Sequence, residues 1–228
     1  MTIGTATLHH DRRVHALEVL GEVLLGWGAL SSLLWVWADV VAAHRYPGYS
    51  LASQTIGELS AIGAPTEPLA VALALAYGVL VSGFGVAVWE CARGKRSLRV
   101  TGALVIAYGV AGFVAPFFPM NPRGSPVSFT DAAHVALAGA TFLIVLLQLA
   151  FGSGASGAKF RVYSLATLAV VVVLGAVAGC CGLGFAAGAP TPWVGIAQRA
   201  CVGAYLLWVT VLDVVLLRAE LEAAASQR

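Results

Sequence analysis

Six long apolar stretches divide the chain. They lie near residues 17–40, 68–91, 98–118, 131–151, 162–185 and 193–217. Each reaches the roughly 20 residues that an α-helix needs to cross a hydrocarbon core of about 30 Å. Because lipid offers no hydrogen bonds to the backbone, each stretch is expected to be helical. The pattern therefore predicts an all-α, polytopic membrane protein, in which residues 1–228 form a single domain of six transmembrane helices.

The composition supports a location in a membrane. Charged residues make up 11% of the chain and apolar residues 59%, whereas soluble domains carry about 25% charged residues. The net charge of +2 gives no reason to expect nucleic acid as a partner. Four cysteines lack CxxC spacing, so neither a metal site nor a disulfide framework can be derived from them. Two alternatives stay open: Cys201 forms a disulfide with Cys180 or Cys181, or these cysteines are free thiols.

The basic residues are distributed unevenly between alternate connections. One side collects Arg12, Arg13, Arg93, Lys95, Arg96, Arg99, Lys159, Arg161, Arg218 and Arg228. The other side has only Arg45 and Arg123, while Arg199 lies within the last span. Because Lys and Arg in short loops stay on the cytoplasmic side, both termini are predicted to be cytoplasmic. We expect a multi-pass protein of the cell membrane.

The first outer connection, residues 44–67, is long and rich in hydroxyl groups and glycine. A connection of this length in a compact protein is usually functional or disordered. Its recurring apolar positions favour a partly helical segment that packs over the bundle; they are Leu51, Ile56, Leu59 and Ile62.

Several short motifs resemble the "domain of unknown function 998" family. They are Tyr49-Ser50, the run from Thr55 through Ser60, the turn from Phe118 to Pro122, His134 near the start of the fourth span, and Gly195-x-x-x-Arg199. Where the turn of the family has an acidic residue, this chain has Asn121. The resemblance covers nearly the whole chain and implies a prokaryotic multi-pass membrane protein without an assigned reaction.

Ionisable residues inside a membrane are costly and mark paired or functional positions. Arg199 lies about 9 Å into the last span from the outer side, so its guanidinium needs a carboxylate partner or a wet cavity. Glu58, Asp131 and Asp39 are the acidic candidates on that side. Asp131 and His134 are spaced i,i+3 and share one helical face.

These residues predict an outward-facing polar pocket. Its candidate catalytic residues are Glu58, Asp131, His134 and Arg199, and its candidate ligand-binding residues are Ser53, Thr55, Ser60 and Asn121. An equally weighted interpretation is structural: Arg199 pairs with Glu58 or Asp131 to fix the outer connection onto the bundle. A zinc site built from His134, Asp131 and Glu58 is the weaker reading, and neither a metal nor a cofactor is predicted.

Three functions stay open at this point, and we favour the first because the richest polar segment lies on the outer side. The first is an enzyme or binder for a lipid-like or apolar small molecule. Membrane lipid would surround the protein, and the outer connection would form a lid over the pocket. The second is a small proton- or ion-coupled transporter that uses Glu22, Asp213 and Arg199 along one route. The third is an accessory subunit that packs against a protein partner through glycine-rich faces. The sequence does not decide whether the protein is an enzyme.

Overall fold

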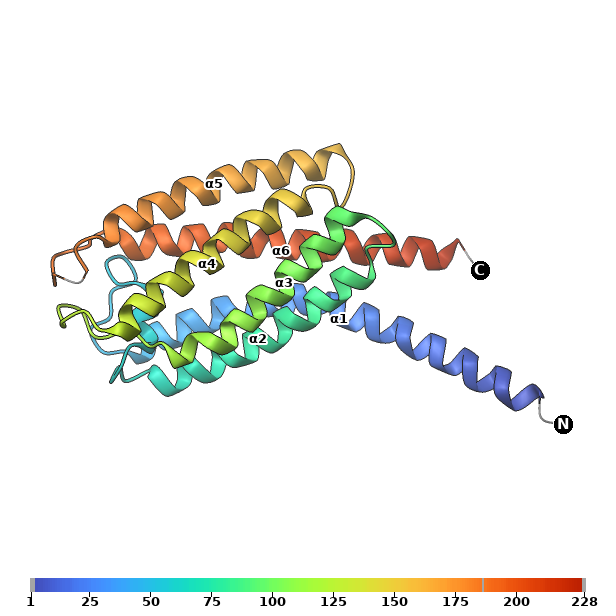
Figure 1. The fold of residues 1–228 in the computed structure, drawn as a ribbon, viewed down its shortest axis with the longest axis horizontal. Helices are drawn as coiled ribbons and strands as arrows, with labels where there is room; N and C mark the ends of the chain where they lie inside the picture. Colours follow the sequence, from blue (N-terminus) through green and yellow to red (C-terminus); the bar gives the residue numbers. More distant parts are fainter. Residues whose placement is uncertain (1–2, 186, 227–228) are drawn as a thin grey trace.

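The computed structural model describes residues 3–185 and 187–226, with side chains from residue 21 onward except for residue 22. These residues form six long helices and two short 3-10 helices, and no strand occurs among them. The elements are α1 (Ile3–Arg45), η1 (Ile56–Ser60), α2 (Glu67–Glu90), α3 (Arg96–Val114), η2 (Ala115–Phe117), α4 (Phe129–Gly152), α5 (Ala158–Gly182) and α6 (Val194–Ala225) (Figure 1).

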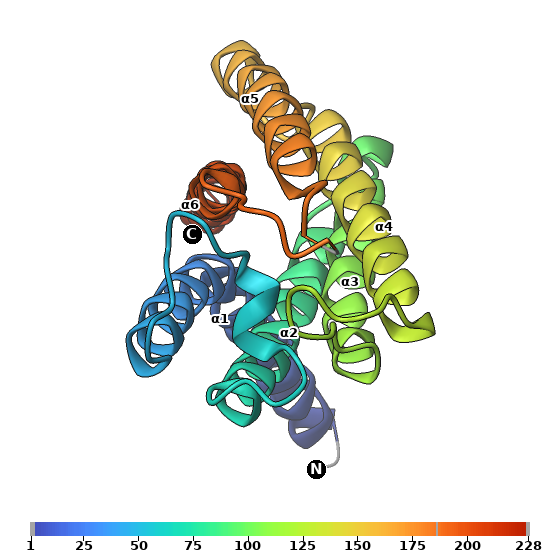
Figure 2. The same ribbon diagram turned by 90° about the vertical axis from the view of Figure 1, so that its left-hand side faces the viewer.

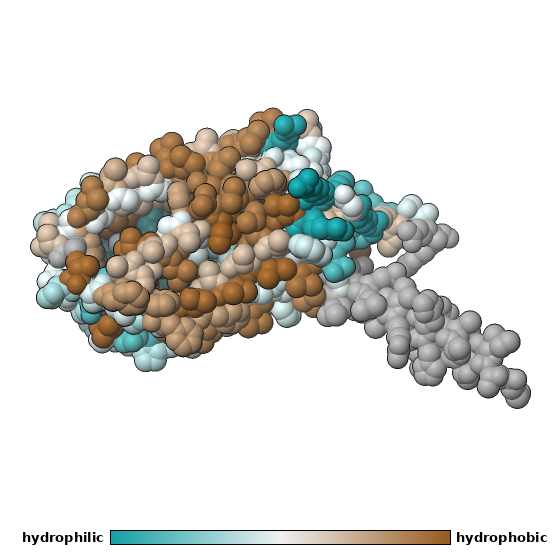
Figure 3. All heavy atoms as spheres, in the orientation of Figure 1, coloured by the Kyte–Doolittle hydropathy of each residue, from teal (hydrophilic) through white to brown (hydrophobic). Residues whose placement is uncertain are grey.

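The prediction of six membrane-spanning helices is confirmed. Each of the six long helices contains a segment that is long and apolar enough to cross a bilayer. The protein is therefore a multi-pass integral membrane protein. Figure 3 shows the corresponding surface, on which hydrophobic side chains form a broad band and hydrophilic ones gather towards its ends. Val135 on α4 and Val162 on α5 are examples of exposed apolar side chains, since each is 69% exposed.

The helix ends differ from the expected spans by a few residues. The first helix, Ile3–Arg45, includes the expected span 17–40 and extends beyond it at both ends. The fifth helix begins at Ala158, before the predicted start at 162, and Phe160 in its first turn is buried against the core. The sixth helix continues to Ala225, since its last turns are rich in alanine, leucine and glutamate, which are strong helix formers.

The six helices close a ring. Each helix packs against the next one in the chain, and α6 packs against α1. The interior of the ring contains large side chains with almost no exposure, among them Phe84, Leu149 and Trp208. One polar pair within it joins α6 to α4: the Tyr205 hydroxyl donates to Gln148 Oε1 at 2.6 Å.

Small residues allow the closest helix contact, between α2 and α3. A methyl group added at Gly102 would lie 2.6 Å from the backbone nitrogen of Trp89, and one at Gly109 would lie 2.3 Å from Ser82 Oγ. Helices in membranes associate through such close backbone approaches. On α5, Gly175 meets the ring of Phe142, whereas Gly179 has open space beside it.

All three longer connections lie at one end of the bundle, which we call the link end (Figure 1). The first link is residues 46–66, the second link is residues 118–128, and the third link joins α5 to α6. The start of α1 and the end of α6 lie at the opposite end. Viewed onto the link end, η1 of the first link lies over the helices (Figure 2), and it contacts α1, α2 and α6.

Candidate functional site

Arg199 is the centre of one polar network at the link end. Its Nε and Nη2 atoms donate to the two carboxylate oxygens of Asp39, each at 2.9 Å. Nη2 also donates to the Tyr49 hydroxyl at 2.7 Å, and Nη1 donates to the carbonyl oxygens of Leu51 and Gln54, both at 3.1 Å. The bidentate pair joins α6 to α1, and the remaining bonds fix the first link to α6.

The local sequence explains this arrangement. Gly195, one helical turn before Arg199, brings the first link close to α6: its amide donates to Ala52 O at 2.9 Å. A methyl group at this position would lie 2.3 Å from Leu51 O. The half-buried Tyr49 completes the network, and burial raises the pKa of its phenol, so the hydroxyl stays protonated and its oxygen accepts the bond from Arg199.

Arg123 is the centre of a second network. Its Nε and Nη2 atoms donate to the carboxylate of Glu58 at 3.3 and 3.0 Å. Nη2 also donates to Ser53 O at 3.1 Å, while Nη1 donates to Ala189 O at 3.2 Å and to Thr191 Oγ1 at 2.6 Å. These bonds use all five N–H donors of the guanidinium. One side chain of the second link thus ties the first and third links together.

Asp131 has a different role, at the start of α4. One carboxylate oxygen accepts from the Asn121 amide at 2.7 Å, and the other accepts from Asn121 Nδ2 at 2.6 Å and from Ser128 N at 2.9 Å. A carboxylate in the first turn of a helix also meets the favourable end of the helix dipole. Asp131 therefore caps α4 and fixes the second link.

His134 is anchored by one of its two ring nitrogens. Nδ1 lies 2.9 Å from Phe118 O. Because a carbonyl oxygen only accepts, the proton of the neutral ring is on Nδ1, and Nε2 carries the lone pair. Nε2 lies towards η1, where a methyl group added at Gly57 would be 3.4 Å away.

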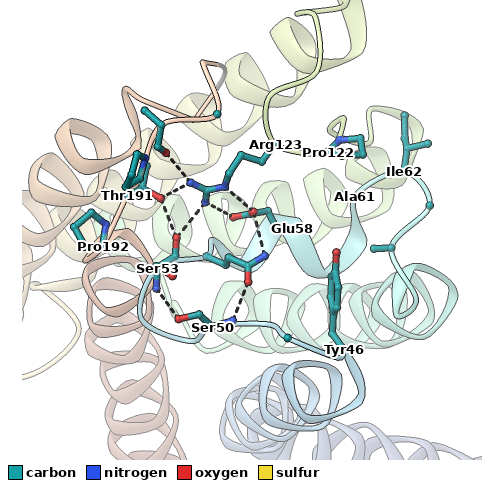
Figure 4. A pocket seen from close by; sticks show the side chains of 17 residues that line it. Tyr46, Ser50, Ser53, Glu58, Ala61, Ile62, Pro122, Arg123, Thr191 and Pro192 are labelled. Carbon is teal, nitrogen blue, oxygen red and sulfur yellow. Dashed lines mark hydrogen bonds and ion pairs between the residues drawn. The ribbon is translucent and has the colours of Figure 1, made fainter.

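Two of the cavities that adjoin these networks are large enough to hold a small molecule. The link cavity, of about 680 Å³, lies between the three links and is lined by residues between 46 and 64, by Pro122 and Arg123, and by residues 188–192. Figure 4 shows Glu58 and Arg123 pointing towards one another in it, with the Tyr46 ring at some distance from the pair. The α4 groove, of about 510 Å³, runs beside the first turns of α4 and is largely apolar.

The four candidate catalytic residues do not form one cluster. Glu58 pairs with Arg123, Arg199 pairs with Asp39, and Asp131 is held by the second link. The expected ion pair of Arg199 with Glu58 or Asp131 is therefore not formed. Asp39 takes that place because the closed ring brings the end of α1 to the start of α6.

The candidate ligand-binding residues mostly support these networks. The amide and hydroxyl of Thr55 donate to Glu58 at 2.6 and 3.1 Å, and the Ser60 hydroxyl donates to Gly57 O at 3.2 Å. Ser53 lines the link cavity and Asn121 lines the α4 groove.

Sequence reasoning missed Arg123 as a site residue. One feature of the sequence could have identified it. Arg123 is one of only two basic residues in the connections on the side that has few basic residues, so its presence there indicates a specific role. All four cysteines are free thiols. Among the described residues, no three His, Cys, Asp or Glu side chains are arranged to hold a metal ion.

The comparison with protein families gives a match over residues 29–215, to the family described as protein of unknown function (DUF998). The chain belongs to this family. The matched region includes the end of α1, all three links and most of α6. No curated protein and no solved structure matched the chain.

Proposed function

We propose that this DUF998 protein binds an amphiphilic molecule, whose polar head occupies the link cavity and whose apolar chain lies in the α4 groove. The observation that supports the proposal most directly is that the two spaces adjoin. Pro122 lines both of them. Arg123 of the link cavity lies over the ring of Phe185 of the α4 groove, with 5.0 Å between its guanidinium carbon and the ring centroid.

The α4 groove suits an apolar chain. Ala132, Val135 and Ala136 line the groove from α4, where positions three and four residues apart share a helical face. Val127 and Phe185 line the groove beside them. Val127 and Val135 are each 69% exposed. Since this face belongs to a membrane-spanning helix, an acyl chain reaches it directly from the bilayer without crossing water.

The charges in the link cavity favour a neutral head group. Among the described residues, Glu58 and Arg123 are the only Asp, Glu, Lys, Arg or His side chains that line it, and they neutralise one another. Every N–H of Arg123 is already bonded, so an anionic head would have to displace an existing partner. The hydroxyls of Tyr46 and Ser53 line the cavity and are available to bond hydroxyl or amide groups.

Binding is favoured over catalysis by the separation of the acid and base groups. General acid–base catalysis needs a donor and an acceptor within hydrogen-bond reach of the same substrate atoms. Here each of these carboxylates already accepts several bonds within its own network, and the Nε2 atom of His134 lies towards η1.

A photoactivatable monoacylglycerol tests the proposal, because it combines one acyl chain with a neutral hydroxyl head. We expect it to label the full chain, in nanodiscs, within the second link or the first turns of α4. Val135→Trp fills the groove and should reduce labelling at least tenfold, whereas Val162→Trp, equally exposed on α5, should leave it unchanged. Tyr46→Phe should weaken it about fivefold, the value of one hydrogen bond.

Unchanged labelling in Val135→Trp, or labelling confined to other helices, overturns the proposal. A probe with an anionic head and the same chain provides the comparison for the head group. Labelling by that probe equal to labelling by the monoacylglycerol would contradict a neutral cavity.

One observation favours a second function, proton-coupled transport. Asp213 is 2% exposed within the ring of helices. Its Oδ2 accepts from the Ala29 amide at 2.7 Å, and its Oδ1 has no partner among the described residues. Buried carboxylates of this kind occur on proton pathways. The side chain of Glu22 lies outside the described residues, and Arg199 is bonded to Asp39. Proton flux in proteoliposomes that disappears in Asp213→Asn would support transport; flux equal to that of empty liposomes would reject it.

A further inference from the structure

A second apolar groove lies near the start of α3, at the end of the bundle opposite the link end. It has a volume of about 830 Å³. Its apolar lining consists of Trp89 from the end of α2 and of Val100, Ala103, Leu104 and Ala107 from α3. Two arginines, Arg96 and Arg99, line the same groove. Figure 3 shows hydrophilic side chains gathered at this end, directly beside the hydrophobic band.

The two arginines differ from Arg123 and Arg199 in having no anionic partner among the residues whose side chains are described. Both are exposed, and among the described side chains neither forms an ion pair. Arg99 lies over the Trp89 ring, 5.7 Å from its centroid, so the aromatic wall holds this guanidinium at the mouth of the groove. No acidic residue is among the described side chains that line the groove.

The groove has the length of one membrane leaflet. From Arg96 to Ala107 the helix rises through eleven residues, or about 16 Å, which is close to half of a hydrocarbon core of about 30 Å. The arginines lie at one end of this distance and the apolar floor covers the rest. The start of α3 adds the positive end of a helix dipole beside the arginines.

From this arrangement we infer that the groove binds an anionic phospholipid. The phosphate lies between Arg96 and Arg99, and one acyl chain lies along Val100, Ala103 and Ala107. Charge complementarity identifies the head, because two guanidinium groups at a helix start, neither in an ion pair with a described side chain, match a phosphate. The apolar floor identifies a lipid rather than a free phosphate. This site is separate from the link cavity. Its occupant has an anionic head group, which the link cavity disfavours.

Native mass spectrometry of the full chain tests the inference, by titration with phosphatidylglycerol and with phosphatidylcholine of identical acyl chains. We expect tighter binding of phosphatidylglycerol. Each arginine near a phosphate contributes about fivefold, which equals about 1 kcal/mol. The double variant Arg96→Gln/Arg99→Gln should therefore lower the preference for phosphatidylglycerol about 25-fold.

The matched control is Lys159→Gln/Arg161→Gln. It removes the same charge from two exposed positions at the start of α5, and it should change the preference less than twofold. An equal loss in this control would show a general effect of surface charge and overturn the site.

The apolar part is tested separately by Ala107→Trp, which fills the groove and keeps both arginines. It should weaken phosphatidylglycerol binding about tenfold, while Ala176→Trp, on the exposed face of α5, should not. Full binding in Ala107→Trp would mean that the head group alone is recognised, and the lipid site would then be rejected. Because every replaced side chain is exposed, the helix bundle itself is not altered.

Discussion

Glu58 and Arg123, which are 65 residues apart in the chain, form an ion pair with 3.0 Å between Oε2 and Nη2. Because Arg123 also bonds Thr191 of the third link, this single guanidinium connects all three links. The side chain of Glu58 is 5% exposed and that of Arg123 is 23% exposed. The link end therefore has a charged but internally neutral centre.

Removal of one partner of this pair should destabilise the protein strongly. Arg123→Gln leaves the Glu58 carboxylate buried without its cation, which costs about 3 kcal/mol. Glu58→Gln should cost a similar amount, and the double variant should cost less than the sum of the two. Unfolding in SDS, followed by circular dichroism, measures these differences.

The exposed pair of Arg93 and Glu220 serves as the control, since 58% of the Arg93 side chain is exposed. Glu220→Gln should change stability by less than about 1 kcal/mol. Equal effects at the two pairs would contradict the assigned role of the link pair.

Replacement of Arg199 by lysine should loosen the first link. Lysine keeps the charge but loses the planar fork that binds both oxygens of Asp39, and it cannot reach Tyr49 and the link carbonyls together. We expect a cost of about 2 kcal/mol and about 30-fold faster hydrogen exchange in the amides of residues 50–60. Arg45→Lys, at an exposed position on α1, should leave this exchange unchanged.

Two glycines of α6 provide a sharp steric comparison. Gly195→Ala would place a methyl group 2.3 Å from Leu51 O and 2.4 Å from Gln54 O. Since both obstacles are backbone atoms, the first link has to move, at a cost of about 1 to 3 kcal/mol. Gly203→Ala meets nothing within 4 Å and should stabilise the helix by up to about 1 kcal/mol. Thermal unfolding in detergent should show a lower stability for Gly195→Ala and a higher stability for Gly203→Ala. Stability changes of equal sign would contradict the packing of the first link on α6.

Asp213→Asn should be tolerated. The amide oxygen keeps the bond from the Ala29 N–H, and the change removes a carboxylate whose Oδ1 lacks a partner among the described residues. We expect a change in stability below about 1 kcal/mol, whereas Asp213→Leu leaves the Ala29 N–H facing an apolar side chain. A large loss of stability in Asp213→Asn would show that the charge itself is required.

The sequence by itself determined the six spans, because the length and apolarity of a segment are local properties, and these two properties decide whether a helix can cross a bilayer. It also determined the excess of basic residues at one end, the family, and the need of Arg199 for an acidic partner. The i,i+3 spacing of Asp131 and His134 placed both side chains at the start of α4.

Only the tertiary structure decided which charges meet. Asp39 and Arg199 are 160 residues apart, and they pair because the ring closes between α1 and α6, which no local pattern records. The partner of Glu58 likewise depends on how three links fold over one another, so Arg123 stayed unrecognised. The link cavity and the α4 groove arise from the same long-range packing, since surfaces from separate segments acquire a shared shape only after the helices have assembled.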